Sequence, residues 1–407
     1  MDGCKGRYRR KDFFERDESF AEYIAVARDF KNKNQIERYR LTRGLTDLLG
    51  EFLCDGADYK NTMTVLTGPS RAGKSHFVLV LLSLLCFSNK KQAEPLVRRL
   101  QKENPTVGNK AAAFVLKGKP WYPIIIEESP DVAAAWERAS ALTAEAAEKY
   151  CGIYVVIDMA DEKTEEMRRL HHFLEERAEH LKLPLSILVI GKRGGSLAGI
   201  FNNRALKQVC FALSFQDECE LLGHFLKKKE GSRILLREEH FLNIAEKSYA
   251  LSCFSSRMTK KEYKRCVVEG CFPFLPLTVF FLWSFGKRMG RSGVSIFLEA
   301  VGTERFRVAM DSSQTDVGGI FMAADMVYDW IMPFAEELTN EAYQILNSVQ
   351  QGRYTSLPVS RQRIKKVEAL FVVSAETGEV PFEIKNLALA LGMTERELRR
   401  YVGTRKQ

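Results

Sequence analysis

Eight consecutive residues of this chain fit the pattern G-x-x-x-x-G-K-[ST], which binds phosphate groups when it follows a strand and opens a helix. They are Gly68, Pro69, Ser70, Arg71, Ala72, Gly73, Lys74 and Ser75, and they are followed by His76. The glycines allow backbone N–H groups to turn inward, and the start of a helix adds the positive end of its dipole. We therefore expect residues 68–76 to bind ATP, with Lys74 on the β- and γ-phosphates and the Ser75 hydroxyl on Mg²⁺.

A carboxylate at the end of a second strand is the other requirement for hydrolysis. The apolar run 153–157 is followed by Asp158, which we expect to hold Mg²⁺ through water, opposite Ser75. In the additional-strand class of P-loop ATPases, a glutamate follows this acid directly and polarises the attacking water. This chain has Met159 at that position.

The nearest acids after Met159 are Asp161 and Glu162. Either of them acts as the catalytic base, or both begin the following helix, since acidic residues favour a helix N-terminus. In the second case the chain binds ATP and hydrolyses it slowly or not at all.

Basic residues follow or precede two further strands. Lys192 and Arg193 come after the apolar run 185–190 and either contact phosphate or face solvent. Arg204 precedes the expected strand 209–215. In AAA+ rings an arginine near this place reaches the nucleotide of the neighbouring subunit, because its planar, always charged guanidinium matches the developing phosphate charge. Arg204 is therefore either such an arginine finger in a homo-oligomer or a surface arginine.

The elements that position these residues alternate between strands and helices. The strand candidates are residues 62–67, 122–126, 153–157, 185–190 and 209–215. The helix candidates between them are residues 74–85, 131–150 and 164–181. This alternation predicts an α/β fold, a P-loop NTPase core with a parallel five-stranded sheet covered on both faces. The long separation of Lys74 and Asp158 indicates an insertion within residues 87–121.

We expect four segments along the chain: an N-terminal helical segment, 1–60, the ATPase core, 61–215, a helical lid domain, 216–350, and a C-terminal unit, 351–407. After residue 216 the strand signal stops, and long helices are expected at 217–225, 238–249, 280–288 and 322–338. The C-terminal unit has a helix at 361–374, and residues 382–402 have helix-turn-helix spacing.

The helix-turn-helix-like pattern consists of a helix at 384–391, a turn at Gly392 and a second helix with Thr394 as its N-cap. The second helix carries three arginines, Arg396, Arg399 and Arg400, at positions where a DNA-binding module places its side chains. The unit either contacts DNA in this way or is a winged-helix-like unit that packs on the ATPase or on a neighbour.

Composition limits the partners and the cellular compartment that we expect for the protein. The net charge of +9 permits contact with nucleic acid without demonstrating it. The nine cysteines are scattered and odd in number, and the first residues are charged, unlike a secretory signal. No apolar run is long enough to span a membrane. We therefore expect a cytoplasmic protein with reduced thiols and no membrane association.

Together these residues resemble an AAA+-type ATPase, because the phosphate loop, intervening strand, acidic strand, sensor strand and arginine-preceded strand follow in that group's order. Four stretches are also similar to the large P-loop ATPases of BREX-type phage-defence systems. These are GKSHF at 73–77, GCFPFLPLT at 270–278, SIF at 295–297 and ADMVYD at 324–329. The chain departs from that family at Met159, at Leu275, where a histidine is usual, and at Val294, where an arginine is usual.

The resemblance implies ATP-driven work in a multi-protein assembly, in phage defence or another DNA transaction. The first hypothesis is therefore an ATP- and Mg²⁺-dependent AAA+-like motor or switch, acting as a homo-oligomer with protein partners near DNA. The alternative is a nucleotide-gated binding module of the initiator-loader or signalling type, with little or no hydrolysis. Met159 favours the alternative. A small-molecule kinase is disfavoured, because no acceptor-substrate site accompanies the phosphate loop.

Overall fold

The chain forms two compact units. The computed structural model describes residues 8–17, 24–30, 32–53, 63–86, 90–127, 129–158, 164–191, 206–314, 318–351, 357–375 and 378–402. One unit, here called the sheet unit, is Ser19–Leu213, and the other, the helical unit, combines Met1–Glu18 with Ser214–Gln407. This division differs from the four expected segments, because the first residues and the C-terminal segment both join the helical unit.

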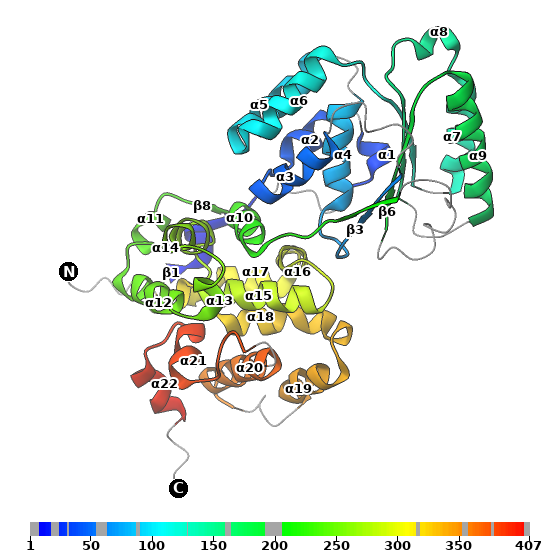
Figure 1. The fold of residues 1–407 in the computed structure, drawn as a ribbon. Coiled ribbons are helices and arrows are strands. Elements are labelled where there is room, and N and C mark those ends of the chain that lie inside the picture. Colours follow the sequence, from blue (N-terminus) through cyan, green and yellow to red (C-terminus); the bar gives the residue numbers. More distant parts are fainter. Residues whose placement is uncertain are drawn as a thin grey trace. The chain divides into compact units, whose positions relative to one another are not determined.

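A parallel five-stranded sheet forms the centre of the sheet unit (Figure 1), and the expected α/β class is confirmed. Its strands are β3 (Met63–Thr67), β4 (Tyr122–Ile126), β5 (Ile153–Ile157), β6 (Leu185–Ile190) and β7 (Leu206–Cys210). They lie in the order β4-β5-β6-β3-β7 and every neighbouring pair is parallel. The strand β6 therefore lies between β3, which leads into the phosphate loop, and β5, which leads to Asp158.

Helices cover both faces of this sheet, as Figure 1 shows. One face packs on α7 (Ser129–Ala141), α8 (Ala144–Ala147) and α9 (Thr164–His180). The other packs on α3 (Arg43–Phe52), α4 (Lys74–Leu85), α5 (Lys90–Glu103) and α6 (Pro105–Lys117). Successive strand side chains alternate between the faces, so Val155 contacts the α9 side and Val156 the α4 side.

Two additional segments lie on the α4 side. The helices α5 and α6 pack against each other as a hairpin within the stretch where we expected an insertion. Two short helices, α1 (Val26–Asp29) and α2 (Lys33–Arg38), precede α3. Val26 of α1 and Tyr39, directly after α2, belong to the same hydrophobic cluster as α4. The N-terminal part of the sheet unit therefore packs beside the helix that begins at Lys74.

The helical unit consists mainly of helices. They are α10 (Phe215–Phe225), α11 (Ser232–Leu235), α12 (Glu239–Tyr249), α13 (Ser252–Ser255), α14 (Lys260–Tyr263), α15 (Pro276–Arg288), α16 (Gly293–Val301), α17 (Glu304–Asp311), α18 (Ala324–Ile331), α19 (Asn340–Gln351), α20 (Val359–Ser374), α21 (Ile384–Leu391) and α22 (Glu395–Val402). The core helix α15 buries Phe280, Phe281 and Phe285 completely. On α10, Glu218 is buried and accepts the backbone N–H of Val294 at 3.2 Å, and burial raises its pKa to about 8.

Short strands attach the first described residues to the helical unit. The strand β1 (Tyr8–Arg9) pairs with β9 (Ser313–Gln314), and β2 (Phe14–Arg16) pairs with β8 (Leu226–Lys228). Between β1 and β2, the Arg10 guanidinium donates to the backbone oxygens of Ala309 at 2.8 Å and Ile320 at 3.0 Å. The expected helical N-terminal segment therefore holds for α1 to α3 but not for the first described residues, and the expectation of no strands after residue 216 was wrong. Strands this short have no hydrophobic periodicity to reveal them.

The C-terminal helices have the predicted helix-turn-helix spacing. Gly392, with a φ of 69°, ends α21, and the Thr394 hydroxyl accepts the Glu397 backbone N–H at 3.2 Å before α22. Both helices pack against α20 within the helical unit, and the Arg363 guanidinium of α20 donates to the backbone oxygen of Leu391 at the end of α21 at 3.4 Å and to both carboxylate oxygens of Asp325 on α18 at 2.9 and 3.1 Å. The segment is therefore integrated with its neighbours and does not form a separate unit.

One predicted strand is displaced. We expected it at residues 209–215, whereas β7 ends at Cys210 and α10 begins at Phe215. The reason is a capping box, in which the Ser214 side chain accepts the Asp217 N–H and the Asp217 side chain accepts the Ser214 N–H, each at 3.0 Å. In the part of the chain that the structure describes, no helix is long and apolar enough to cross a membrane.

Candidate functional site

Residues 68–75 form a tight loop between β3 and α4. Gly73 has a φ of 97° directly before α4, and no side chain caps the first turn of this helix. A Cβ on Gly68 would lie 2.3 Å from the backbone oxygen of Phe211, just after β7. Glycine is therefore needed at position 73 for its left-handed backbone and at position 68 for a close approach. The uncapped N–H groups of α4 are suited to binding an anion.

A hydrogen bond joins the loop to the acidic strand. Ser75 Oγ donates to Asp158 Oδ2 at 2.8 Å, although β6 separates the strands that lead to the two residues. Burial raises the pKa of Asp158, whereas the Ser75 hydrogen bond and the Lys74 charge lower it. A hydroxyl and a carboxylate oxygen are ligands that Mg²⁺ accepts. The structure thus brings together the two residues that we expected at the metal.

The Lys74 ammonium lies against the loop itself. Its Nζ donates to the backbone oxygens of Gly68 at 3.1 Å and Pro69 at 2.7 Å. Both carbonyls belong to the same loop as the N–H groups that are expected to bind phosphate. The loop's own backbone oxygens therefore hold the Lys74 charge at the place where it would meet the β- and γ-phosphates.

His76, which we expected among the nucleotide-binding residues, contacts the N-terminal helices. Its Nε2 lies 2.8 Å from the backbone oxygen of Gln35, and its ring packs edge-on against Tyr39 with 4.7 Å between the ring centroids. Burial lowers the pKa of His76. The side chain thus connects the first turn of α4 to the segment around α2.

A further acid, Glu127, lies beside Asp158. It follows β4 as Asp158 follows β5, and the last residues of these strands, Ile126 and Ile157, are paired. Glu127 Oε1 accepts the backbone N–H of Val26 at the start of α1. Burial raises the pKa of Glu127, and the charges of Asp158 and Asp131 raise it further, against the lowering effect of backbone hydrogen bonds.

Sequence analysis did not single out Glu127. The signal that found Asp158, a carboxylate directly after an apolar strand, is also present here, after Ile124, Ile125 and Ile126. The other candidates, Asp161, Glu162 and Arg204, together with Lys192 and Arg193, lie outside the described residues. Their roles stay predictions.

The arginines of the C-terminal unit are at the surface. Arg396, Arg399 and Arg400 are exposed on α22, and Arg399 lies 3.8 Å from Glu395 one turn before it. Their position is compatible with either expectation for this unit, contact with DNA or with a neighbouring protein.

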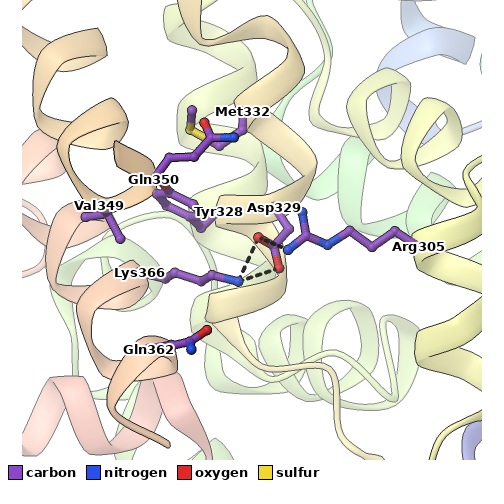
Figure 2. A pocket seen from close by; sticks show the side chains of 8 residues that line it. All are labelled: Arg305, Tyr328, Asp329, Met332, Val349, Gln350, Gln362 and Lys366. Carbon is purple, nitrogen blue, oxygen red and sulfur yellow. Dashed lines mark hydrogen bonds and ion pairs between the residues drawn. The ribbon is translucent and has the colours of Figure 1, made fainter. Parts of the chain in front are cut away.

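A cavity of about 170 Å³ in the helical unit contains a charged cluster (Figure 2). Asp329 on α18 lies at its centre, 2.8 Å from both Lys366 of α20 and Arg305 of α17. The side chains of Asp329 and Lys366 are 18% and 19% exposed. Since the carboxylate already pairs with both cations, this cluster connects three helices of the unit and serves as a structural contact.

One comparison with known proteins gives a match. A family model described as SPOR domain matches residues 80–155, less than a fifth of the chain. Among curated proteins, none matches. The matched stretch begins inside α4, after the phosphate loop, and ends inside β5, before Asp158. The phosphate loop and Asp158 therefore lie outside the matched stretch, whereas Glu127 lies inside it.

Proposed function

We propose that this chain is an ATP- and Mg²⁺-dependent ATPase of the AAA+ type, working as a motor or switch in a multi-protein assembly. The observation that carries the proposal is the hydrogen bond between Ser75 Oγ and Asp158 Oδ2 at 2.8 Å. It joins the phosphate-loop motif to the acid expected to share its metal. A loop motif without a ligand would have no need of an acid at this point.

The chemistry of the donors fits Mg²⁺–ATP. Backbone N–H groups at the uncapped start of α4 and the Lys74 ammonium suit the phosphates, while the oxygens of Ser75 and Asp158 suit a small hard cation. When bound, the cation would neutralise charge on the β- and γ-phosphates. The residues of this chain would bind and orient the phosphate chain and hold it at one edge of the sheet.

The strand order supports the AAA+ part of the proposal. The strand β6 lies between the loop strand β3 and the acid strand β5. An extra strand at this place is the feature for which the additional-strand class of P-loop ATPases is named. A BREX-like role in phage defence, direct DNA contact through Arg396, Arg399 and Arg400, and oligomerisation through Arg204 remain parts of the proposal.

The decisive experiment measures steady-state ATP hydrolysis against protein concentration, with and without duplex DNA, beside Lys74→Ala. Turnover that depends on Lys74 and rises with concentration or DNA supports an oligomeric motor, and Arg204→Ala should then remove the concentration dependence. Tight ATP binding without turnover above the Lys74→Ala control supports the nucleotide-gated module. No ATP binding by the wild type contradicts both.

The SPOR match favours a second candidate, peptidoglycan binding by residues 80–155. In that stretch, β5 is buried along its whole length and β4 along most of it, with helices on both faces. A polymer would therefore meet the helices α5–α8 and not the sheet. Co-sedimentation of the full chain with purified peptidoglycan tests this candidate, and retention in the supernatant would dismiss it.

A further inference from the structure

We propose that Glu127 is the base that activates the attacking water, in place of the glutamate that Met159 replaces. This inference rests on the proposed ATPase function. It assigns the hydrolytic step to a residue that is distant in sequence from the phosphate loop and from Asp158, but adjacent to Asp158 in the sheet.

The register of β4 and β5 puts Glu127 beside Asp158. Ile126 pairs with Ile157, and the Asp158 N–H donates to the Ile126 backbone oxygen at 2.9 Å. Glu127 and Asp158, which follow Ile126 and Ile157, therefore leave the same edge of the sheet on neighbouring strands. Since adjacent strands are about 4.8 Å apart, the two residues leave the sheet side by side, and the charge of Asp158 acts on Glu127.

Both carboxylates lie on the face of the sheet that carries α4. Ile126 and Ile157 contact the opposite face, so the next side chain on each strand turns toward α4. Two contacts agree with this direction. Asp158 binds Ser75 on the first turn of α4, and Glu127 binds the N–H of Val26, which packs in the α4-side cluster.

The start of α1 fixes the position of the Glu127 carboxylate. The N–H of Val26 donates to Oε1. The Glu127 backbone N–H in turn donates to Asp131 Oδ2 at 2.9 Å, which fixes the turn between β4 and α7. A general base must lie within hydrogen-bond reach of the water that it deprotonates, and a fixed carboxylate next to the metal-binding acid lies at the edge of the sheet where that water would bind.

In the proposed step, Glu127 accepts a proton from water as the water oxygen bonds to the γ-phosphorus. The bond from the γ-phosphorus to the β–γ bridging oxygen breaks, and its electron pair stays on that oxygen of ADP. Glu127 then gives the proton to the released phosphate or to solvent, and the carboxylate is restored.

The test compares the full-length wild type with Glu127→Gln. Glutamine has the same shape and keeps an oxygen that can accept the Val26 N–H, but it is not a base. The matched control is Glu137→Gln, the same substitution at an exposed position of α7. Asp161→Asn and Glu162→Gln test the acids that sequence analysis proposed for this role.

Three quantities are measured: the Kd of a fluorescent, non-hydrolysable ATP analogue with Mg²⁺, the single-turnover rate of ATP hydrolysis, and the identity of the nucleotide that stays bound after incubation. For Glu127→Gln we expect a Kd within about 3-fold of wild type and a rate at least about 100-fold lower. The retained nucleotide should be ATP in this variant and ADP in the wild type and in Glu137→Gln.

Wild-type hydrolysis in Glu127→Gln would overturn the inference and leave the ATPase proposal intact. A loss of analogue binding in this variant would also overturn it, since Glu127 would then only support the nucleotide site through α1. Hydrolysis abolished by Asp161→Asn or Glu162→Gln but not by Glu127→Gln would assign the base to the loop after Asp158. Failure of the wild type to bind the analogue would instead remove the ATPase proposal itself.

Discussion

Removing the charge of Lys74 tests the phosphate site most directly. The substitution Lys74→Met keeps the length of the side chain and its apolar stem but removes the ammonium. In the structure this ammonium lies on the loop, bonded to the backbone oxygens of Gly68 and Pro69. It is half-buried, so a phosphate placed at the start of α4 would meet it away from bulk water.

The expected loss follows from the charges. Two unit charges 4 Å apart at an effective dielectric constant near 20 attract by about 4 kcal/mol. Part of this attraction is offset, because the ammonium already has hydrogen-bond partners in the loop. A net loss of about 3 kcal/mol raises the Kd for Mg²⁺–ATP about 100-fold, since every 1.4 kcal/mol is about tenfold.

The matched control is Lys110→Met, the same substitution at an exposed position of α6, outside the loop. There we expect less than about a fivefold change, because exposed charges are screened at about 0.15 M salt. Isothermal titration calorimetry at that salt concentration measures both Kd values, and circular dichroism verifies the fold. Equal losses in the two variants would mean that ATP responds only to net charge, and wild-type affinity in Lys74→Met would refute the phosphate loop.

Three further predictions concern single side chains. Asp158→Asn keeps an acceptor for Ser75 but should lower Mg²⁺-dependent hydrolysis about 100-fold while changing ATP affinity less, and unchanged turnover would refute the metal assignment. Burial raises the pKa of Glu218 from its ordinary 4.5 to about 8. Between pH 4.5 and pH 8 the carboxyl is therefore protonated in the folded chain and ionised in the unfolded chain, so the stability of the fold falls as the pH rises through this range. Glu218→Gln lacks this effect. Its free energy of unfolding, relative to that of the wild type, should therefore rise by several kcal/mol between pH 5 and pH 9, at about 1.4 kcal/mol per pH unit. Urea unfolding followed by hydrogen exchange of α10 measures this difference, and a difference that does not change with pH would contradict the buried acid. Asp329→Asn should lower the stability of the helical unit by about 1–3 kcal/mol in thermal unfolding. Arg305→Ala, which removes the exposed partner of Asp329, should cost less than about 1 kcal/mol. Equal losses in the two variants would show that burial does not strengthen the ion pair of Asp329 and Lys366.

The strands that hold the site could be predicted because each is a short apolar run with polar residues at its ends. The bounds of β4, β5 and β6 agree with the prediction residue for residue. The strand β7 was displaced because Phe211 and Leu213 continue its apolar pattern after it ends. Ser214 and Asp217 then begin a helix with a capping box, a local signal that outweighs two apolar residues.

The division into units could not be predicted from local pattern. The first described residues join a unit that begins again at residue 214, through pairings of two or three residues and the half-buried Arg10. An arginine whose guanidinium bonds backbone oxygens some three hundred residues away looks, in sequence, like any surface arginine. Only tertiary contacts distinguish the two.

The same limit explains why the search for the base in the sequence did not reach Glu127. A motif search extends forward from Asp158, because in the ATPases that the sequence resembles the glutamate follows that acid at once. A parallel sheet, however, collects the carboxyl ends of strands that are far apart in sequence, and here β4 and β5 are neighbours in register. An acid after either strand reaches the same edge, so under our proposal Glu127 at the end of β4 compensates for Met159 after β5. Missing catalytic residues in such folds are therefore best sought at the ends of adjacent strands before hydrolysis is judged absent.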